Sequence, residues 1–231
     1  MREDRIDAVL LDMGGVLIPE LQSYERSVRD RAFLAALEEQ GVAHPESFVV
    51  ERAKRLREAY RALADECRQP DLDVVFADCT AAVGGLLLRA FKAEAAPAPY
   101  PHARAVVVEL AHDFALGLVS NNAMPGDHHA RVLRRAGILQ HIGCAVWSAN
   151  FGRRKPDPAM ILHVLDQLGV RRQHAIFVGD KLRTDVAAAR RARVRSVYIR
   201  KRGAPYATPS LRPDFTISDL RALPVLLRQI G

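Results

Sequence analysis

Short runs of apolar residues recur along the chain, separated by stretches long enough for a helix. Their hydrophobicity is continuous rather than alternating, which is typical of strands buried on both faces of a parallel sheet. The runs lie at residues 8–11, 115–119, 145–147, 175–178, 196–199 and 215–217. Helical patterns lie at about residues 103–112, 127–137, 157–168, 184–193 and 219–229. The alternation predicts an α/β fold with a doubly wound parallel sheet, a Rossmann-like core.

The segment between the first and second runs breaks this rhythm, because it contains helical patterns and no strand run. Four apolar residues from Val28 to Leu37 are spaced for one face of a first helix. Further helices are expected at about residues 46–66 and 71–91, followed by a Pro/Ala-rich return at 95–101. We therefore expect a core formed by residues 1–18 and 100–231, with an inserted all-helical domain at residues 19–99.

Composition narrows the class of protein. Hydrophobic residues make up 49% of the chain and charged residues 26%, as in an ordinary soluble globular protein. No apolar run approaches the roughly 20 residues that span a bilayer, and the charged N-terminus makes a poor signal peptide. The three cysteines have neither disulfide-framework nor zinc-ligand spacing. We expect a cytoplasmic protein with no membrane partner.

The net charge of +7 does not by itself indicate a nucleic-acid partner. Arginine is spread over several helical segments, and aromatic residues, only 6% of the chain, are not interleaved with it. This argues against nucleic-acid binding and leaves a positive potential that can attract anionic substrates. Nothing in the sequence sets the oligomeric state.

Polar residues follow four of the predicted strands at the point where each strand ends. Ligands of open α/β sheets bind beyond the carboxyl ends of the strands, so these side chains are expected to meet there. They are Asp12 with Gly14 after the first strand, Ser120 and Asn121 after the second, Lys155 after the third, and Asp180 and Asp185 after the fourth. Carboxylates, a hydroxyl and a lysine at one edge suit phosphoryl chemistry with a hard cation.

Each of these residues also has a simpler structural explanation. Asp12 could form a turn, and Asp185 could be favoured by a helix dipole. The segment Lys155-Pro-Asp-Pro158 could begin and cap a helix. It is the ordered set, with each member at a strand end, that favours a site.

The sequence resembles the haloacid dehalogenase-like hydrolase superfamily in four motifs along essentially the whole chain. The motifs are Asp12-Met-Gly-Gly-Val-Leu17, Leu118-Val-Ser120-Asn, Lys155-Pro-Asp-Pro158 and Val178-Gly-Asp180 with Asp185 after it. The helical insert between the first two motifs resembles the helical cap of the commonest (C1) subgroup. The resemblance implies a Mg²⁺-dependent phosphatase that acts on a small phosphorylated metabolite.

The resemblance also implies a role for each matching residue. Asp12 would attack phosphorus and form an aspartyl-phosphate, and Lys155 would neutralise charge beside it. Ser120 and the backbone after it, at Asn121, would hold phosphate oxygens. Asp12, the backbone carbonyl of Gly14, Asp180 and Asp185 would hold Mg²⁺.

One position departs from the phosphatase pattern. The family's phosphatases have a second aspartate, the general acid and base, where this chain has Gly14. Such a group contributes about 10²–10⁴-fold to rate. Glu20, His102, His128 and His129 are candidate substitutes; alternatively, the substrate has a good leaving group, such as a glycosyl or acyl phosphate.

Three other functions compete with phosphatase activity. A metal-free dehalogenase would not need Asp180 and Asp185. A phosphonatase would need a cap lysine, for which Lys54 and Lys92 are the candidates. A non-catalytic binding protein is suggested by Gly14 but leaves the other retained positions without a chemical reason. Specificity is expected to come from the cap and from residues 18–24, which do not identify the substrate.

Overall fold

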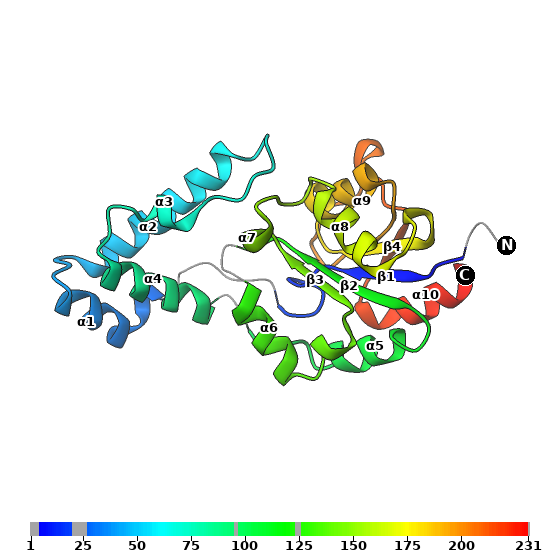
Figure 1. The fold of residues 1–231 in the computed structure, drawn as a ribbon, viewed down its shortest axis with the longest axis horizontal. Coiled ribbons are helices and arrows are strands. Elements are labelled where there is room, and N and C mark those ends of the chain that lie inside the picture. The colour runs from blue at the N-terminus through cyan, green and yellow to red at the C-terminus, as the bar shows by residue number, and fades with distance from the viewer. Residues whose placement is uncertain (1–4, 20–26, 95–96, 123–125, 231) are drawn as a thin grey trace.

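The computed structural model describes residues 5–19, 27–94, 97–122 and 126–230. Six parallel strands form one sheet in the order β3-β2-β1-β4-β5-β6 (Figure 1). The strands are β1 Ala8–Leu11, β2 Ala115–Ser120, β3 Cys144–Trp147, β4 Ala175–Gly179, β5 Arg195–Ile199 and β6 Phe215–Ile217. Each lies within a residue of its predicted bounds. The α/β class and the parallel sheet are confirmed.

Helices cover both faces of the sheet, which explains why the central strands are apolar throughout. One face packs against α5 (Ala103–Leu110), α6 (Gly126–Arg135) and α10 (Leu223–Ile230). The other packs against α8 (Ala159–Leu168) and α9 (Ala187–Ala192). Figure 1 shows the two layers on either side of the strands. In the described part of the chain, no helix is both long enough and apolar enough to cross a membrane.

Two predicted helices of the core begin differently from the expectation. Residues 184–193 form a short π-helix, η4 (Leu182–Val186), followed by α9 rather than one continuous helix. The segment expected at 219–229 starts with a 3₁₀ turn, η6 (Leu220–Ala222), because the Asp219 side chain accepts from the Arg221 N–H, and α10 follows.

A one-turn helix, α7 (Ser148–Phe151), follows β3 and had no signal in the hydrophobic pattern. Shorter 3₁₀ turns are η1 Ser27–Arg29, η2 Leu139–His141, η3 Arg172–His174 and η5 Pro209–Leu211.

The segment of residues 27–94, which lies between β1 and α5, is largely helical and has its own small core. Its helices are α1 (Arg31–Glu39), α2 (Pro45–Ala62), α3 (Leu72–Val75) and α4 (Ala81–Glu94). They pack around a separate cluster of buried residues, Leu37, Val49, Phe76, Val83 and Leu87. We refer to this segment as the helical insert.

The single helix expected at residues 71–91 is wrong, because the chain breaks between α3 and α4. The Asp71 side chain caps α3, and the Thr80 hydroxyl accepts from the Val83 N–H at 3.3 Å to start α4. Between them Asp78 turns towards α2, where its carboxylate lies 3.0 Å from Arg52 and 2.6 Å from Arg55. These local hydrogen bonds and ion pairs replace one turn of helix.

The helical insert contacts the core through a short antiparallel bridge, formed by the segment between α2 and α3 on one side and the loop after α7 on the other. Arg68 pairs with Arg153, the Gln69 N–H donates to Gly152 at 2.9 Å, and the Arg154 N–H donates to Cys67 at 2.8 Å. The loop that carries Lys155 is therefore held on one side by the helical insert.

Candidate active site

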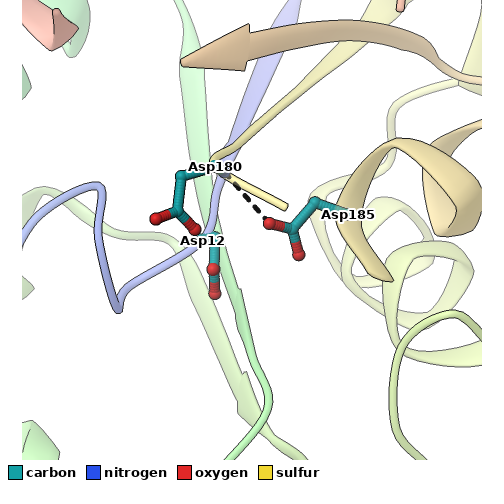
Figure 2. Close-up of side chains that lie close together, drawn as sticks. All are labelled: Asp12, Asp180 and Asp185. Carbon is teal, nitrogen blue, oxygen red and sulfur yellow. Dashed lines mark hydrogen bonds between the residues drawn. The ribbon is translucent and has the colours of Figure 1, made fainter. Parts of the chain in front are cut away.

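A cavity of about 170 Å³ lies beyond the carboxyl ends of the central strands. It is lined by Asp12, Gly14, Ser120, Asn121, Arg154, Lys155, Lys181, Thr184 and Asp185. Asp180 stands beside it, with a carboxylate oxygen within 4.8 Å of those of Asp12 and Asp185 (Figure 2). The structure thus brings together the seven residues that the sequence placed at the strand ends.

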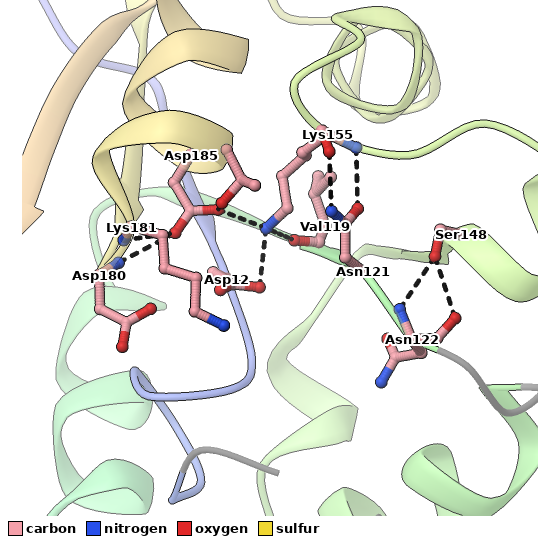
Figure 3. Close-up of polar contacts among 10 residues, drawn as sticks. Asp12, Val119, Asn121, Asn122, Ser148, Lys155, Asp180, Lys181 and Asp185 are labelled. Carbon is pink, nitrogen blue, oxygen red and sulfur yellow. Dashed lines mark hydrogen bonds and ion pairs between the residues drawn. The ribbon is translucent and has the colours of Figure 1, made fainter. Parts of the chain in front are cut away.

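The ammonium group of Lys155 lies at the centre of this cluster (Figure 3). Its Nζ is 2.8 Å from Asp12 Oδ1, 2.9 Å from Asp185 Oδ1, and donates to the Val119 carbonyl at 2.9 Å. Lys155 is only 2% exposed, so all three donors of the ammonium are used inside the protein. A buried ammonium shared by two carboxylates keeps both charged groups in place.

Burial and the ion pairs with Lys155 have opposite effects on the pKa values of Asp12 and Lys155. Burial raises the pKa of Asp12 to about 6, and Asp185 and Asp180 add to the rise, while Lys155 opposes it. Burial alone would lower the pKa of Lys155, but Asp12 and Asp185 outweigh it and the pKa is raised. Lys155 therefore stays charged at neutral pH, and Asp12 is ionised above about pH 6.

Asp185 is anchored by the backbone that precedes η4. Its Oδ2 accepts the N–H groups of Asp180 at 3.0 Å and Lys181 at 2.9 Å, and its Oδ1 faces Lys155. A Cβ on Gly179 would collide with the Asp185 side chain, so this close approach requires glycine. The turn after β4 holds the Asp185 carboxylate rigidly towards Asp12.

The three carboxylates fit a hard divalent cation. Asp12, Asp180 and Asp185 each offer an oxygen, and Mg²⁺ prefers carboxylate and carbonyl oxygen ligands. Asp180 Oδ1 is buried without a hydrogen-bond partner, whereas its Oδ2 pairs with Lys201 Nζ at 2.9 Å. Burial also raises the pKa of Asp180. An unsatisfied buried carboxylate oxygen beside two other carboxylates is the feature that a bound cation would satisfy.

The two glycines that follow Met13 differ in whether a side chain could replace their hydrogen. Gly15 has φ +78°, and a Cβ there would collide with the Asp180 carboxylate and the Lys201 ammonium. Gly14 borders the cavity, and a Cβ added to it would meet nothing within 4 Å. Space for a side chain at position 14 is therefore present but unused.

None of the three candidate histidines lines the cavity. His129 is buried, its Nε2 lies 2.9 Å from the Asn122 amide nitrogen, and burial lowers its pKa to about 4. His102 stacks on Tyr100 and borders a different cavity next to Asp219. His128 contacts His129 and is half-buried on α6. Glu20 lies outside the described residues, as does most of the segment 18–24.

The two residues expected to hold phosphate differ in their contacts. Ser120, at the end of β2, is buried and borders the cavity. The Asn121 side chain is already engaged with the backbone of Lys155: its Oδ1 accepts from Lys155 N, and its Nδ2 donates to Lys155 O, each at 2.8 Å. Its amide group therefore positions the lysine.

Four residues at the site had not been singled out from the sequence. Arg154, Lys181 and Thr184 line the cavity, and Lys201 pairs with Asp180. Lys201 follows β5, so extending the strand-end rule by one strand would have found it. The other three adjoin residues already chosen, but their positions depend on how the loops turn.

A family model described as haloacid dehalogenase-like hydrolase matches residues 6–193. Among curated proteins, the phosphoserine phosphatase of Thermus thermophilus is 30% identical over 87% of this chain and 66% of its own length. The N-acylneuraminate-9-phosphatase of Rattus norvegicus is 28% identical over 55% of this chain and 51% of its length. The chain thus spans about half to two thirds of these relatives.

Solved structures show the same fold. A 2-haloacid dehalogenase from Pseudomonas syringae pv. Tomato matches with a TM-score of 0.69 and 24% identity over 98% of this chain and 100% of that one. A phosphatase from Thermococcus onnurineus matches with a TM-score of 0.66 and 20% identity over 96% and 98%. At this identity the likeness establishes the architecture, and the chemistry has to be argued from the site.

Proposed function

Because the chain belongs to the haloacid dehalogenase-like hydrolases, we propose that it is a Mg²⁺-dependent phosphatase of small phosphorylated metabolites, with Asp12 as the nucleophile. The observation that carries this proposal is the Lys155 ammonium, held between Asp12 and Asp185, two of the three carboxylates that with Asp180 fit a divalent cation.

Asp12 is the carboxylate that would attack phosphorus. It ends the buried strand β1, borders the cavity and is paired on Oδ1 by Lys155. One of its carboxylate oxygens forms a bond to phosphorus while the bond from phosphorus to the leaving oxygen breaks, which gives an aspartyl-phosphate and an alkoxide that takes its proton from water. Water then attacks the phosphorus, releases inorganic phosphate and regenerates Asp12.

Charge is the main obstacle to this reaction, since an anionic nucleophile approaches an anionic ester. Lys155 offsets part of the negative charge from within the protein and keeps Asp12 ionised near neutral pH. Asp12, the backbone carbonyl of Gly14, Asp180 and Asp185 would hold Mg²⁺, which when bound screens the remaining repulsion. Ser120 and the backbone N–H of Asn121, two residues that border the cavity, would bind phosphate oxygens.

The size of the cavity favours a small substrate. Its volume of about 170 Å³ lies below the roughly 300–1,000 Å³ of pockets that take drug-sized ligands. The curated relatives are named for phosphoserine, N-acylneuraminate 9-phosphate, glyceraldehyde 3-phosphate and phosphoglycolate, all phosphorylated small molecules. The helical insert, taken as a cap over residues 19–99, would close the cavity around such a substrate.

The site argues against the competing functions. A metal-free dehalogenase would not need a cation site, whereas Asp12, Asp180 and Asp185 form a cluster that fits a divalent cation. Lys54, one lysine considered for phosphonate cleavage, is exposed on α2 and pairs with Glu58; the side chain of Lys92 lies outside the described residues. Only Gly14 favours a non-catalytic role. The ion pair between Lys155 and Asp12 does not support such a role, because a binding protein has no chemical need for it.

We expect phosphate release from p-nitrophenyl phosphate to require a divalent cation. Removing the metal with EDTA should abolish turnover, because Asp12 and the phosphate would then repel each other without a screening charge. Adding back Mg²⁺ should restore it, as measured by nitrophenolate absorbance. Unchanged turnover in EDTA would remove the metal from the proposal while leaving the Asp12 reaction open.

The rate of phosphate release should fall as the pH drops through about 6. The pKa of Asp12 is raised to about 6 by burial, so below that pH the carboxylate holds a proton and cannot attack. The decrease in kcat/KM should approach about tenfold per pH unit. Saturating Mg²⁺ should move the midpoint downward, because a cation favours the ionised carboxylate. A profile flat from pH 5 to pH 8 at low Mg²⁺ would contradict this assignment.

A further inference from the structure

Arg154 stands apart from the other cations around the cavity. Both of its neighbours in sequence form ion pairs: Arg153 pairs with Asp157, and Lys155 pairs with Asp12 and Asp185. Lys201 pairs with Asp180. Within the described chain, the Arg154 guanidinium makes no ion pair and donates no hydrogen bond, although the residue borders the cavity and is half-buried. A guanidinium has five N–H donors, so its hydrogen-bonding capacity is unused.

The helical insert fixes the position of this guanidinium. Arg154 Cζ lies 4.3 Å from the centroid of the Tyr60 ring, which comes from α2. The Tyr60 hydroxyl is itself fixed by two hydrogen bonds: it accepts from Gln69 Nε2 at 2.7 Å and donates to the Asn122 carbonyl at 3.4 Å. The backbone of Arg154 is held by the helical insert as well, since its N–H donates to the Cys67 carbonyl. Stacking on an aromatic ring leaves the edge of the guanidinium, which carries the N–H groups, available to a ligand.

Burial without a counter-charge has a cost that a ligand would relieve. Burial lowers the pKa of Arg154, and no carboxylate offsets the effect. An anion bound to the guanidinium would provide that missing charge and accept two parallel hydrogen bonds. The phosphate of the substrate already has expected partners in Ser120, the backbone N–H of Asn121 and the cation that the three carboxylates would hold.

We propose that Arg154, stacked on Tyr60, binds a second anionic group of the substrate, a carboxylate close to the phosphate ester. This inference rests on the proposed phosphatase function and specifies its substrate class, namely small phosphorylated carboxylic acids. Arg154 is then a specificity-determining residue supplied by the core loop and oriented by the helical insert.

The experiment measures the inhibition of p-nitrophenyl phosphate hydrolysis by two phosphonates that differ in one group. Phosphonoacetate carries a carboxylate and methylphosphonate does not. We expect the wild-type protein with Mg²⁺ to bind phosphonoacetate about 10–100-fold more tightly, the range for a charge-assisted hydrogen bond. Arg154→Met should abolish this preference while changing the inhibition constant of methylphosphonate less than about threefold. Arg154→Lys should retain part of it, since the charge remains.

Controls separate recognition from a structural role. Arg61→Met removes an exposed arginine of the same helix that carries Tyr60 and should leave both inhibition constants unchanged. If Arg154→Met weakens both phosphonates equally, or if the wild type does not distinguish them, the proposal is overturned. If the wild type hydrolyses no p-nitrophenyl phosphate, the proposed phosphatase function fails by itself. Calorimetric titration of the two phosphonates into wild type and Arg154→Met then decides the role of Arg154 separately.

Discussion

Asp12→Asn is expected to reduce phosphate release from p-nitrophenyl phosphate by about 10³-fold or more, because it removes the nucleophile. Asparagine has nearly the same shape as aspartate, so the change deletes the charge without opening a cavity. Lys155 keeps Asp185 and the Val119 carbonyl as partners. The variant should therefore fold and give the circular dichroism spectrum of the wild type. Its loss of activity should appear as a lower kcat.

The matched control for this variant is Asp113→Asn, an exposed aspartate on the loop before β2. It makes the same chemical change away from the cavity and should retain wild-type turnover. Mass spectrometry of protein quenched during turnover should show added phosphate in the wild type and none in Asp12→Asn. Equal, slow release by wild type and Asp12→Asn would remove the catalytic interpretation and favour a binding protein.

Gly14→Asp is expected to increase the rate of hydrolysis of alkyl phosphates by about 10²–10⁴-fold, the usual contribution of a general acid. The position borders the cavity, and an added Cβ meets no atom within 4 Å, so a side chain can begin there without moving the backbone and extend towards the cavity. Its protonated form would donate to the leaving oxygen as the bond to phosphorus breaks. Nitrophenolate leaves without a proton, so p-nitrophenyl phosphate should gain much less.

Gly84→Asp provides the control, because it adds the same side chain to an equally open glycine on α4, in the helical insert. A comparison of glycerol 3-phosphate with glucose 1-phosphate then tests the leaving-group hypothesis in the wild type. Faster wild-type hydrolysis of the glycosyl phosphate would support a substrate that needs no acid. Comparable wild-type rates on the two, with no gain from Gly14→Asp, would mean that another group already supplies the proton.

The sheet and the central part of the site could be predicted from the sequence for the same reason. Strands covered on both faces must be apolar throughout, as Leu10 and Val178 are, so they stand out as uninterrupted runs. Their carboxyl ends necessarily meet, which brings Asp12 close to Asp185 although they are far apart in the chain. Fold class and the residues at the strand ends follow from this one constraint.

The rest depends on contacts that a linear pattern does not carry. The apolar positions of residues 71–91 continue through the break at residues 77–80, so periodicity alone gives one helix where there are two. The stacking of Arg154 on Tyr60 joins a core loop to the helical insert, and no local signal links them. Two predictions go beyond the observed contacts. One is the role of each site residue, including Asp12 and Lys155, which substitution tests; the other is the extent of the insert, residues 19–99.

The position of β1 in the middle of the sheet has a consequence for the newly made chain. Ala8 pairs with Ala115 on one side and with Ala175 on the other, so this apolar strand has no partner until β2 and then β4 have been synthesised. At about 5–20 residues per second, the wait for β4 is on the order of ten seconds or longer. Until then the apolar segment that precedes Asp12 lacks its native partners, and unpaired apolar strands are the segments through which newly made chains aggregate.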